Sequence, residues 1–273
     1  MIDSNTKLIS IFGNPIKHSL SPIMQNKWLC DCKINAVYLA FAFEKNQLKK
    51  AVDSVRELGM IGANVTVPYK IEVMKYLDVI DFAAKKIGSV NTIVNKAGKL
   101  IGYNTDWSGF INDLKANKIN LKNKKVFVLG AGGACKAVLY ALNNIGVKKI
   151  FLCSRTYKKV KQLSKLYMNI VPVKIEEIKD DFLVNVDSFI NTSTCGMKPT
   201  DILPFAINKY NKNIVFYDLI YNKQTPFKKF ALKNKLKYFS GEGMLIRQGA
   251  DAFKLWTLKS PKINAVKKLF TGE

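Results

Sequence analysis

The sequence contains few arginines, a single histidine and few acidic residues. Among its 273 residues there are three arginines and one histidine, and 20 acidic residues stand against 44 basic ones. A net charge of +24 would ordinarily point to nucleic acid or an anionic membrane as a partner. However, arginine is the residue that contacts phosphate and guanine in a bidentate manner, and the 41 lysines are spread along the whole chain. We therefore expect no nucleic-acid partner, although a basic nucleic-acid-binding protein is the alternative from another functional class.

Long apolar runs and a set of paired cysteines are also missing. No stretch approaches the ~20 apolar residues that a membrane-spanning helix needs, and the first residues carry no signal-peptide pattern. The five cysteines are odd in number and lie mostly in apolar runs, as is typical of reduced core thiols. With a single histidine in the chain, Cys30 and Cys32 lack partners for a four-ligand zinc site. These absences predict a cytoplasmic protein with no membrane partner and no metal.

The remaining composition is that of a chain with a large core. Hydrophobic residues make up 48% and charged residues 23%, which excludes disorder. Short apolar strands alternate with amphipathic helices, and this pattern predicts an α/β fold with parallel strands. In the N-terminal part we expect strands at 8–12, 36–43 and 61–67 and a helix at 47–58. We expect a further helix that Ser21 caps and that has Pro22 in its first turn.

A second alternation begins near residue 124. Its strands are continuously apolar, which indicates burial on both faces of a doubly wound sheet. We expect strands at 126–129, 149–153, 170–173, 187–191 and 214–218, with helices at 134–145 and 158–167. A helix at 107–118 would bridge the two parts, and the helical segment after Gly241 could return to the first part. The sequence thus predicts two α/β domains, one of residues 1–106 plus 242–273 and one of residues 107–241.

A glycine-rich turn follows the first strand of the second part. It lies between a buried strand and a helix, which is the setting that a dinucleotide-binding turn requires. Gly130 can make the tight turn, and Gly132 lets backbone N–H groups approach a pyrophosphate at the helix N-terminus. The third glycine of the usual pattern would fall at Cys135, so Ala137 would help supply the close packing. The turn predicts a dinucleotide cofactor bound by Gly130, Ala131, Gly132, Gly133 and Ala134.

The end of the next strand favours NADP over NAD. A domain that prefers NAD usually places Asp or Glu about 20 residues after the turn, to bind the ribose 2′-hydroxyl. Here Ser154, Arg155 and Thr156 stand instead, with Lys159 close behind. A guanidinium holds a 2′-phosphate that a carboxylate would repel. The alternative is that Arg155 is simply a solvated cation, but in a chain with three arginines we interpret it as a phosphate ligand.

Polar residues also end two strands of the first part, at 64–70 and at 102–106. The carboxyl ends of parallel strands face the crevice in which α/β proteins bind ligands. By charge alone, Lys70 would be one lysine among 41. The single His18 precedes Ser19 and Ser21, but no G-x-S-x-G nucleophile elbow accompanies it. We therefore interpret His18 as a structural hydrogen-bonding residue and not as the base of a hydrolase.

These segments, taken in order, resemble the shikimate dehydrogenase family from about Ile11 to Trp256. Residues 13–22 are similar to the family's loop for the substrate carboxylate, and residues 64–70 to its catalytic-lysine motif. Residues 89–92 and 104–106 resemble the segments that carry a substrate-binding asparagine and the catalytic aspartate. Residues 154–156 resemble the family's clamp for the 2′-phosphate. Later family segments match at 191–193, at Asp218 with Tyr221, and at 241–248.

The resemblance implies an NADP-dependent oxidoreductase that reversibly reduces 3-dehydroshikimate to shikimate in the biosynthesis of chorismate and aromatic amino acids. Hydride addition builds negative charge on the carbonyl oxygen, and a positioned cation and proton donor lowers that barrier. The resemblance assigns this catalytic role to Lys70 and Asp106. It implies substrate contacts by Ser19, Ser21, Thr66, Asn91, Tyr221 and Gln248. It implies cofactor contacts by Ser154, Arg155, Thr156, Lys159, Thr192, Leu219 and Gly241, in addition to the glycine turn.

The resemblance also assigns the two domains. Residues 1–106 plus 242–273 would form the substrate-binding and catalytic domain, and residues 107–241 the Rossmann domain for NADP. The sequence departs from the family pattern at Ser154, usually asparagine, at Gln25, commonly histidine, and in the segment 221–226, which is one residue shorter. The runner-up function is a quinate/shikimate dehydrogenase that uses NAD. We expect shikimate or 3-dehydroshikimate as the small-molecule partner and a monomer or homodimer.

Overall fold

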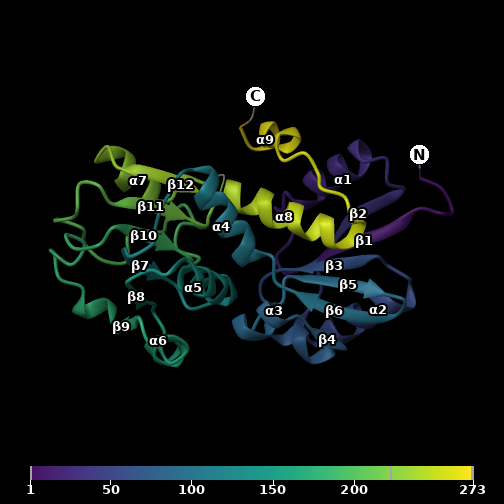
Figure 1. The fold of residues 1–273 in the computed structure, drawn as a ribbon, viewed down its shortest axis with the longest axis horizontal. Coiled ribbons are helices and arrows are strands. Elements are labelled where there is room, and N and C mark those ends of the chain that lie inside the picture. Colours follow the sequence, from purple (N-terminus) through teal and green to yellow (C-terminus); the bar gives the residue numbers. More distant parts are fainter. Residues whose placement is uncertain (1, 222, 272–273) are drawn as a thin grey trace. The chain divides into compact units, whose positions relative to one another are not determined.

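The computed structural model describes residues 2–221 and 223–271 and divides into two compact units (Figure 1). Unit 1 consists of Met1–Gly109 and Leu245–Glu273, and unit 2 of Phe110–Met244. Helices α4 (Asp106–Ala116) and α8 (Glu242–Thr257) contain the two boundaries. Unit 1 is therefore built from two separate stretches of chain. Asn222, in the shortened segment 221–226, lies outside the described residues.

The sheet of unit 1 has six strands in the order β2-β1-β3-β5-β6-β4. The strands are β1 (Lys7–Phe12), β2 (Ala36–Phe41), β3 (Gly62–Val65), β4 (Val79–Ile80), β5 (Thr92–Lys96) and β6 (Lys99–Tyr103). The expected strands at 36–43 and 61–67 are thus shorter than predicted. Strand β5 runs antiparallel to both of its neighbours, whereas the other pairs are parallel. The prediction of parallel strands is wrong for β5.

The reversed strand brings four chain segments to one edge of this sheet. Strands β1, β3 and β6 end at that edge, while β5 begins there. Phe12 pairs with Val65, and Thr92 pairs with both Asn64 and Tyr103. The residues just beyond β1, β3 and β6 and just before β5 therefore lie together.

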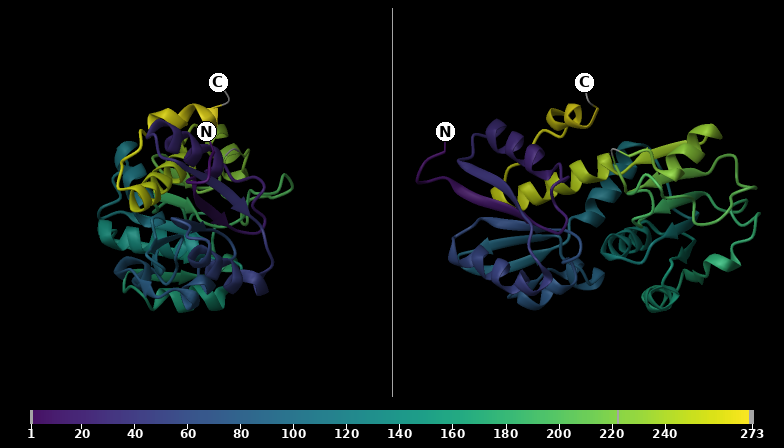
Figure 2. Two further views of the ribbon diagram at one scale, coloured as in Figure 1. Left: turned by 90° about the vertical axis from the view of Figure 1, so that its right-hand side faces the viewer. Right: turned by 180° about the vertical axis from the view of Figure 1, so that it is seen from behind.

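Helices cover both faces of the sheet of unit 1 (Figures 1 and 2). One face packs against α1 (Ser21–Asp31) and α8, through a cluster that includes Trp28, Phe253 and Trp256. The other face packs against α2 (Leu48–Glu57) and α3 (Phe82–Ile87). Short 3₁₀ segments occur at Lys45–Gln47 and Glu72–Tyr76, and α9 (Asn264–Thr271) ends the described chain. The predicted cap of α1 is wrong, because Ser21 is already helical and the N-cap is Leu20, which makes no side-chain cap hydrogen bond.

Trp256 ties α8 to the sheet. Its indole Nε1 donates a hydrogen bond to the Ile93 carbonyl at 2.9 Å. Gly62 leaves the room that this contact needs, because a Cβ there would collide with the Ile93 carbonyl and the indole. A strand glycine that allows such a close approach is a packing requirement rather than a flexible joint.

The sheet of unit 2 has six parallel strands in the order β12-β11-β10-β7-β8-β9. The strands are β7 (Lys125–Leu129), β8 (Lys149–Cys153), β9 (Ile170–Val173), β10 (Ser188–Asn191), β11 (Val215–Asp218) and β12 (Lys237–Ser240). Counted within the unit, this is the order 3-2-1-4-5-6 of a doubly wound dinucleotide-binding sheet. The predicted Rossmann fold of this part is confirmed.

Helices α5 (Gly133–Ile145), α6 (Tyr157–Ser164) and α7 (Pro226–Lys233) complete unit 2, with a 3₁₀ segment at Ile175–Glu177. The helix predicted at 158–167 is three residues shorter at its end. Phenylalanines from β7, β10 and β11 meet Phe227 of α7 in one apolar cluster. The strand order reverses between β7 and β10, and in such sheets ligands bind beyond the carboxyl ends of the strands at this point. Among the described residues, no helix is long and apolar enough to cross a membrane.

Candidate active site

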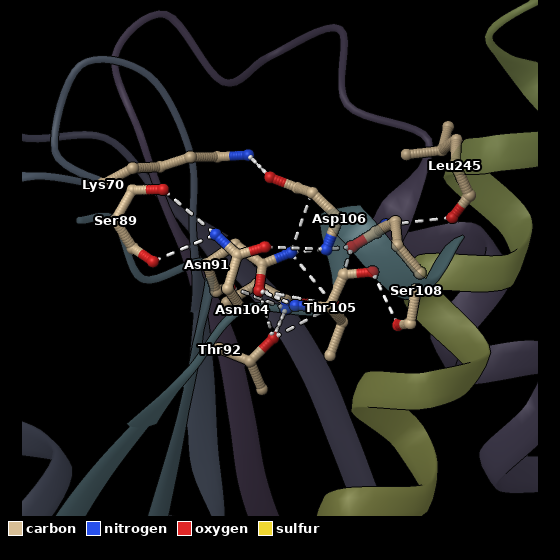
Figure 3. Close-up of polar contacts among 11 residues, drawn as sticks. Lys70, Ser89, Asn91, Thr92, Asn104, Thr105, Asp106, Ser108 and Leu245 are labelled. Carbon is tan, nitrogen blue, oxygen red and sulfur yellow. Dashed lines mark hydrogen bonds and ion pairs between the residues drawn. The ribbon is translucent and has the colours of Figure 1, made fainter. Parts of the chain in front are cut away.

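Lys70 and Asp106 form a largely buried ion pair in unit 1 (Figure 3). Lys70 Nζ lies 2.6 Å from Asp106 Oδ2, and the two side chains are 15% and 7% exposed. Lys70 is in the loop after β3, and Asp106 begins α4 just after β6. The two strands end at the same edge of the sheet, which brings these distant residues together. An acidic residue in the first turn of a helix is also favoured by the helix dipole.

Asn91 connects Asp106 to its surroundings. Its Nδ2 shares two hydrogens among three acceptors, which are Asp106 Oδ1 and Thr105 Oγ1, each at 2.9 Å, and Gln248 Oε1 at 3.2 Å. Its Oδ1 accepts from the Thr105 backbone N–H at 2.8 Å. Because a backbone N–H can only donate, this last bond fixes which end of the amide faces Asp106. Asp106 therefore accepts at both carboxylate oxygens, from Lys70 and from Asn91.

The fully buried Tyr38 supports Asn91 through Asn64. Tyr38 donates its hydroxyl to Asn64 Oδ1 at 2.7 Å. Asn64 Nδ2 donates to the Asn91 carbonyl at 3.0 Å and to Thr92 Oγ1 at 3.1 Å. Burial raises the pKa of the Tyr38 phenol well above its usual value, against a hydrogen bond with the Ser21 side chain. Tyr38 and Asn64 were not predicted as site residues. The only signal in the sequence was a polar side chain within each of two apolar strands.

Gln248 joins the site from α8. Its Nε2 donates to the Leu245 carbonyl at 2.9 Å, so its Oε1 is turned toward Asn91 and Thr105. Helix α4 approaches this residue closely at Gly109, where a Cβ would lie 2.7 Å from the Gln248 backbone nitrogen. A larger residue at Gly109 would push the two helices apart. The structure thus brings together Lys70, Asn91, Asp106 and Gln248 of the predicted set.

The loop of residues 13–22, the serine loop, lies against the loop that follows β3. The Asn14 N–H donates to the Val67 carbonyl at 3.1 Å, and a Cβ at Gly13 would collide with the Thr66 side chain. Within the loop, Ser19 Oγ accepts from the Ser21 N–H at 3.3 Å. These contacts place Thr66 and the start of the loop, at Gly13 and Asn14, at this edge of unit 1.

Two residues near this loop were singled out in the sequence, Gln25 as a departure from the family pattern and His18 as a structural residue. Gln25 is buried in α1, and its Nε2 donates to the Gly249 carbonyl of α8 at 3.0 Å. His18 is exposed, and within the described chain its side chain makes no hydrogen bond. The structural hydrogen-bonding role predicted for His18 is therefore wrong.

In unit 2, the predicted cofactor residues follow the strand ends. The last residues of β8, β7, β10, β11 and β12 pair in register across the sheet. The residue that follows each strand therefore lies at the same edge. These five residues are Ser154, Gly130, Thr192, Leu219 and Gly241. All five belong to the predicted set.

The glycine turn fits a close ligand approach. Gly130 has φ +122°, and a Cβ there would collide with Thr192 Oγ1, which itself donates to the Leu129 carbonyl at 2.8 Å. Gly132 is the N-cap of α5, and a Cβ there would meet no heavy atom within 4 Å. Gly130 is thus required by the fold, whereas Gly132 faces open space at a helix N-terminus. Such a terminus presents backbone N–H groups to an anion.

The basic residues after β8 are available to a ligand. Arg155, Thr156 and Lys159 are exposed, and Ser154 Oγ accepts from the Thr156 N–H at 3.1 Å. The turn that binds Thr156 to Ser154 fixes the backbone on both sides of Arg155. No carboxylate follows β8 before Lys159.

Asp218 organises the loop before Tyr221. It is 1% exposed and accepts from Thr225 Oγ1 at 2.7 Å, Asn191 Nδ2 at 2.9 Å and the Ile220 N–H at 3.1 Å. Burial nevertheless raises the pKa of the Asp218 carboxyl, and these hydrogen bonds oppose the rise. Burial also raises the pKa of the Tyr221 phenol. Tyr221 belongs to unit 2, whereas the other predicted substrate residues belong to unit 1.

Comparisons with known proteins agree with this geometry. The family model for the shikimate dehydrogenase substrate-binding domain matches residues 11–93, and that for shikimate/quinate 5-dehydrogenase matches residues 113–203. A shikimate dehydrogenase (NADP(+)) of Caldanaerobacter subterraneus subsp. tengcongensis is 43% identical, with 94% of this chain and 93% of the relative covered. The chain belongs to the shikimate dehydrogenase family.

Solved shikimate dehydrogenases have the same fold. The enzyme of Aquifex aeolicus has a TM-score of 0.92 and 39% identity, over 98% of both chains. The enzyme of Thermus thermophilus, solved with NADP(H) and shikimate, has a TM-score of 0.88 and 31% identity, over 98% of this chain and 99% of that one. The relatives thus cover both units of this family member.

The described residues fit the cofactor of the shikimate dehydrogenase family. The open space at Gly132 admits a pyrophosphate to the N-terminus of α5, and the exposed Arg155 and Lys159 suit a 2′-phosphate. The described residues contain no group of three or more His, Cys, Asp or Glu side chains that could hold a metal ion. The polar groups of the site are instead hydroxyls, amides and one ion pair.

Proposed function

We propose that this chain is an NADP-dependent shikimate dehydrogenase that reversibly reduces the 3-keto group of 3-dehydroshikimate. The observation that carries the proposal is the Lys70–Asp106 ion pair, with its 2.6 Å contact and its largely buried side chains. An ammonium held in this way is both a cation and a proton donor for a carbonyl oxygen that gains charge. The family membership supplies the substrate class that such a pair serves.

The chemistry divides between cofactor and protein. NADPH supplies the hydride when it is bound. Lys70 stabilises the negative charge that develops on the substrate oxygen, and the Lys70–Asp106 pair delivers the proton that completes the hydroxyl. Asn91 donates to the other oxygen of Asp106 at 2.9 Å and so keeps the carboxylate oriented toward the ammonium. In the reverse direction the pair accepts the proton from the shikimate hydroxyl.

The surrounding side chains suit a polyhydroxylated acid. Ser19 and Ser21 offer hydroxyl donors to the carboxylate, while Thr66, Asn91 and Gln248 hydrogen-bond the ring hydroxyls. A site whose buried polar groups are paired by the substrate discriminates strongly against analogues that lack a hydroxyl. We assign Tyr221 to the same substrate on the strength of the family pattern.

We assign residues 1–106 plus 242–273 to substrate binding and catalysis, and residues 107–241 to NADP. The glycine turn at 130–134 would hold the pyrophosphate and residues 154–156 with Lys159 the 2′-phosphate. Thr192, Leu219 and Gly241 would line the remaining cofactor site, because they follow strands whose ends pair in register.

We propose that the enzyme works in the cytoplasm as a monomer or homodimer and without a nucleic-acid partner. The supporting observation is that all five cysteines are free thiols, which suits a reducing compartment. Light scattering of the purified protein would give the oligomeric state. Binding of labelled DNA at physiological salt would contradict the absence of a nucleic-acid partner.

An absorbance assay at the NADPH band tests the function. Shikimate and quinate are each offered with NADP⁺ and with NAD⁺. We expect the highest kcat/KM for shikimate with NADP⁺. A marked preference for quinate or for NAD⁺ would instead indicate the quinate/shikimate type, and no turnover with any pair would overturn the proposal.

A further inference from the structure

We propose that Asn104 is a positioning residue that sets the spacing between Lys70 and Asp106. The proposal rests on the proposed function, since it takes these two residues as the catalytic pair. Asn104 is 4% exposed and lies between the end of β6 and the start of α4. Its amide bonds the Asp106 backbone directly and bonds Ser89, the neighbour of a residue that is bonded to the Lys70 backbone (Figure 3).

The oxygen of the amide holds Asp106. Asn104 Oδ1 accepts from the Asp106 backbone N–H at 3.0 Å. This is a local turn of the kind that asparagine side chains form two residues ahead of themselves. It orders the first N–H of α4 and thereby the direction in which the Asp106 side chain leaves the helix.

The nitrogen of the amide holds Ser89, whose neighbour Val90 is bonded to the backbone of Lys70. Asn104 Nδ2 donates to the Ser89 carbonyl at 2.9 Å and to Ser89 Oγ at 3.0 Å. The next residue, Val90, donates its N–H to the Lys70 carbonyl at 2.8 Å. Asn104 is thus linked to Asp106 directly and to Lys70 through residues 89–90.

The donors of Asn104 are fully used by these bonds. A primary amide has two N–H hydrogens, and Ser89 offers the acceptors for both. Both hydrogens therefore already have acceptors within the protein, and the side chain is 4% exposed. It acts through the positions of Lys70 and Asp106 and not by direct contact with the substrate.

The sheet contains a matched control. Asn95 Nδ2 donates to the Val55 and Met60 carbonyls at 3.0 and 2.9 Å, and its Oδ1 accepts from the Gly98 N–H at 2.8 Å. Asn95 therefore has the same pattern of two donated bonds and one accepted backbone bond. It lies toward the other end of β5, near the turn into β6. Its loss should cost stability without moving Lys70 or Asp106.

The experiment compares Asn104→Ala, Asn104→Ser and Asn95→Ala with the wild-type enzyme. Measured quantities are kcat and KM for shikimate, the primary deuterium isotope effect, NADP⁺ affinity and the thermal midpoint. We expect Asn104→Ala to lower kcat about 10- to 100-fold, the loss that a displacement of order 1 Å produces. We expect KM to change less than kcat, the isotope effect to rise because hydride transfer becomes slower, and NADP⁺ affinity to be unchanged.

Asn104→Ser separates positioning from folding. Serine still caps the Asp106 N–H but is too short to reach Ser89, so we expect kcat to fall although the helix start is kept. This variant also serves if Asn104→Ala does not fold. Asn95→Ala should lower the thermal midpoint and leave kcat unchanged.

Two results overturn the proposal. Either both Asn104 variants keep wild-type kcat, or their loss of kcat is matched by Asn95→Ala at equal loss of stability. An inactive wild-type enzyme would instead reject the proposed function, so the two failures are distinguishable.

Discussion

Replacement of Lys70 by alanine tests the ion pair directly. In the structure the ammonium is 2.6 Å from Asp106 Oδ2, and the second donor to that carboxylate is the neutral amide of Asn91. The variant removes the cation and the proton donor of the proposed reaction in one step. Asp106 would keep its single bond from Asn91 and face the substrate oxygen as an uncompensated negative charge.

The expected loss follows from what one positioned acid–base group contributes. Such a group typically provides about 10²- to 10⁴-fold in rate. At about 1.36 kcal/mol for each factor of ten, the barrier should rise by about 3–5 kcal/mol. The loss should appear in kcat, because the interaction with the developing charge exists only in the transition state.

The assay is steady-state oxidation of shikimate, followed at the NADPH band, with NADP⁺ binding measured separately. Lys75→Ala is the matched control, because Lys75 pairs with Glu72 at 2.8 Å in the same stretch of chain but is 67% exposed. We expect NADP⁺ affinity to be retained in both variants and kcat to be unchanged in Lys75→Ala. A fall of less than about tenfold for Lys70→Ala would refute the assignment of Lys70 as the acid–base group.

Three further predictions concern unit 2. Arg155→Gln should reduce the preference for NADP⁺ over NAD⁺ by roughly 10- to 150-fold, the equivalent of about 1.5–3 kcal/mol for hydrogen bonds to a charged group; unchanged discrimination between the two cofactors would contradict this. Gly132→Ala should leave the thermal midpoint unchanged and weaken NADP⁺ binding measured by calorimetry. Gly130→Ala should lower the thermal midpoint, because its Cβ would collide with Thr192. Equal effects of the two variants on the midpoint would contradict the open space at Gly132. The pKa of the Asp218 carboxyl is raised in the folded state, so the folded state binds more protons than the unfolded state above pH 3.8. The contribution of Asp218 to the free energy of unfolding therefore falls as pH rises through the raised pKa. In urea unfolding from pH 4 to 7, the free energy of unfolding should fall less steeply with pH in Asp218→Asn than in the wild type, and equal pH dependence in both would disprove this.

The strands of unit 2 were largely predictable, because burial on both faces leaves a continuous apolar run. The strands expected at 149–153 and 170–173 coincide with β8 and β9. Each run is bounded by glycine or polar residues, so little ambiguity exists about its ends. Among the residues at strand ends, Gly130 and Ser154 were identified from their place after a strand, whereas Thr192, Leu219 and Gly241 were assigned by the family resemblance.

The direction of β5 was not predicted. It depends on a two-residue turn at Ala97 and Gly98, which have φ of 51° and 87°. Positive φ at both positions is typical of a tight hairpin. The Ala-Gly pair is a weaker signal than Asn-Gly, and the strands on both sides are only partly apolar. The antiparallel strand was therefore overlooked, although it is what brings Asn91 to the site.

The supporting network around the ion pair also could not be derived from the sequence. Tyr38 and Asn64 lie 26 residues apart, and Asn104 lies 15 residues from Ser89. No periodicity links residues at such separations, because the contact arises only when several strands are in register. The motifs indicate which residues serve the reaction, whereas the sheet determines which side chains keep them in place.

The division of unit 1 into two stretches has a consequence for the order of folding during synthesis. Residues 1–109 leave the ribosome first, but Phe253 and Trp256, which complete one face of their sheet, are made after all of unit 2. Domains generally fold as units as they emerge, from the N-terminal one onward. Here the unit that begins second in the chain can finish first, while one apolar face of the nascent sheet of unit 1 is covered by α1 alone until α8 is made. Chaperone dependence during translation should therefore arise from the first hundred residues and end once α8 has emerged.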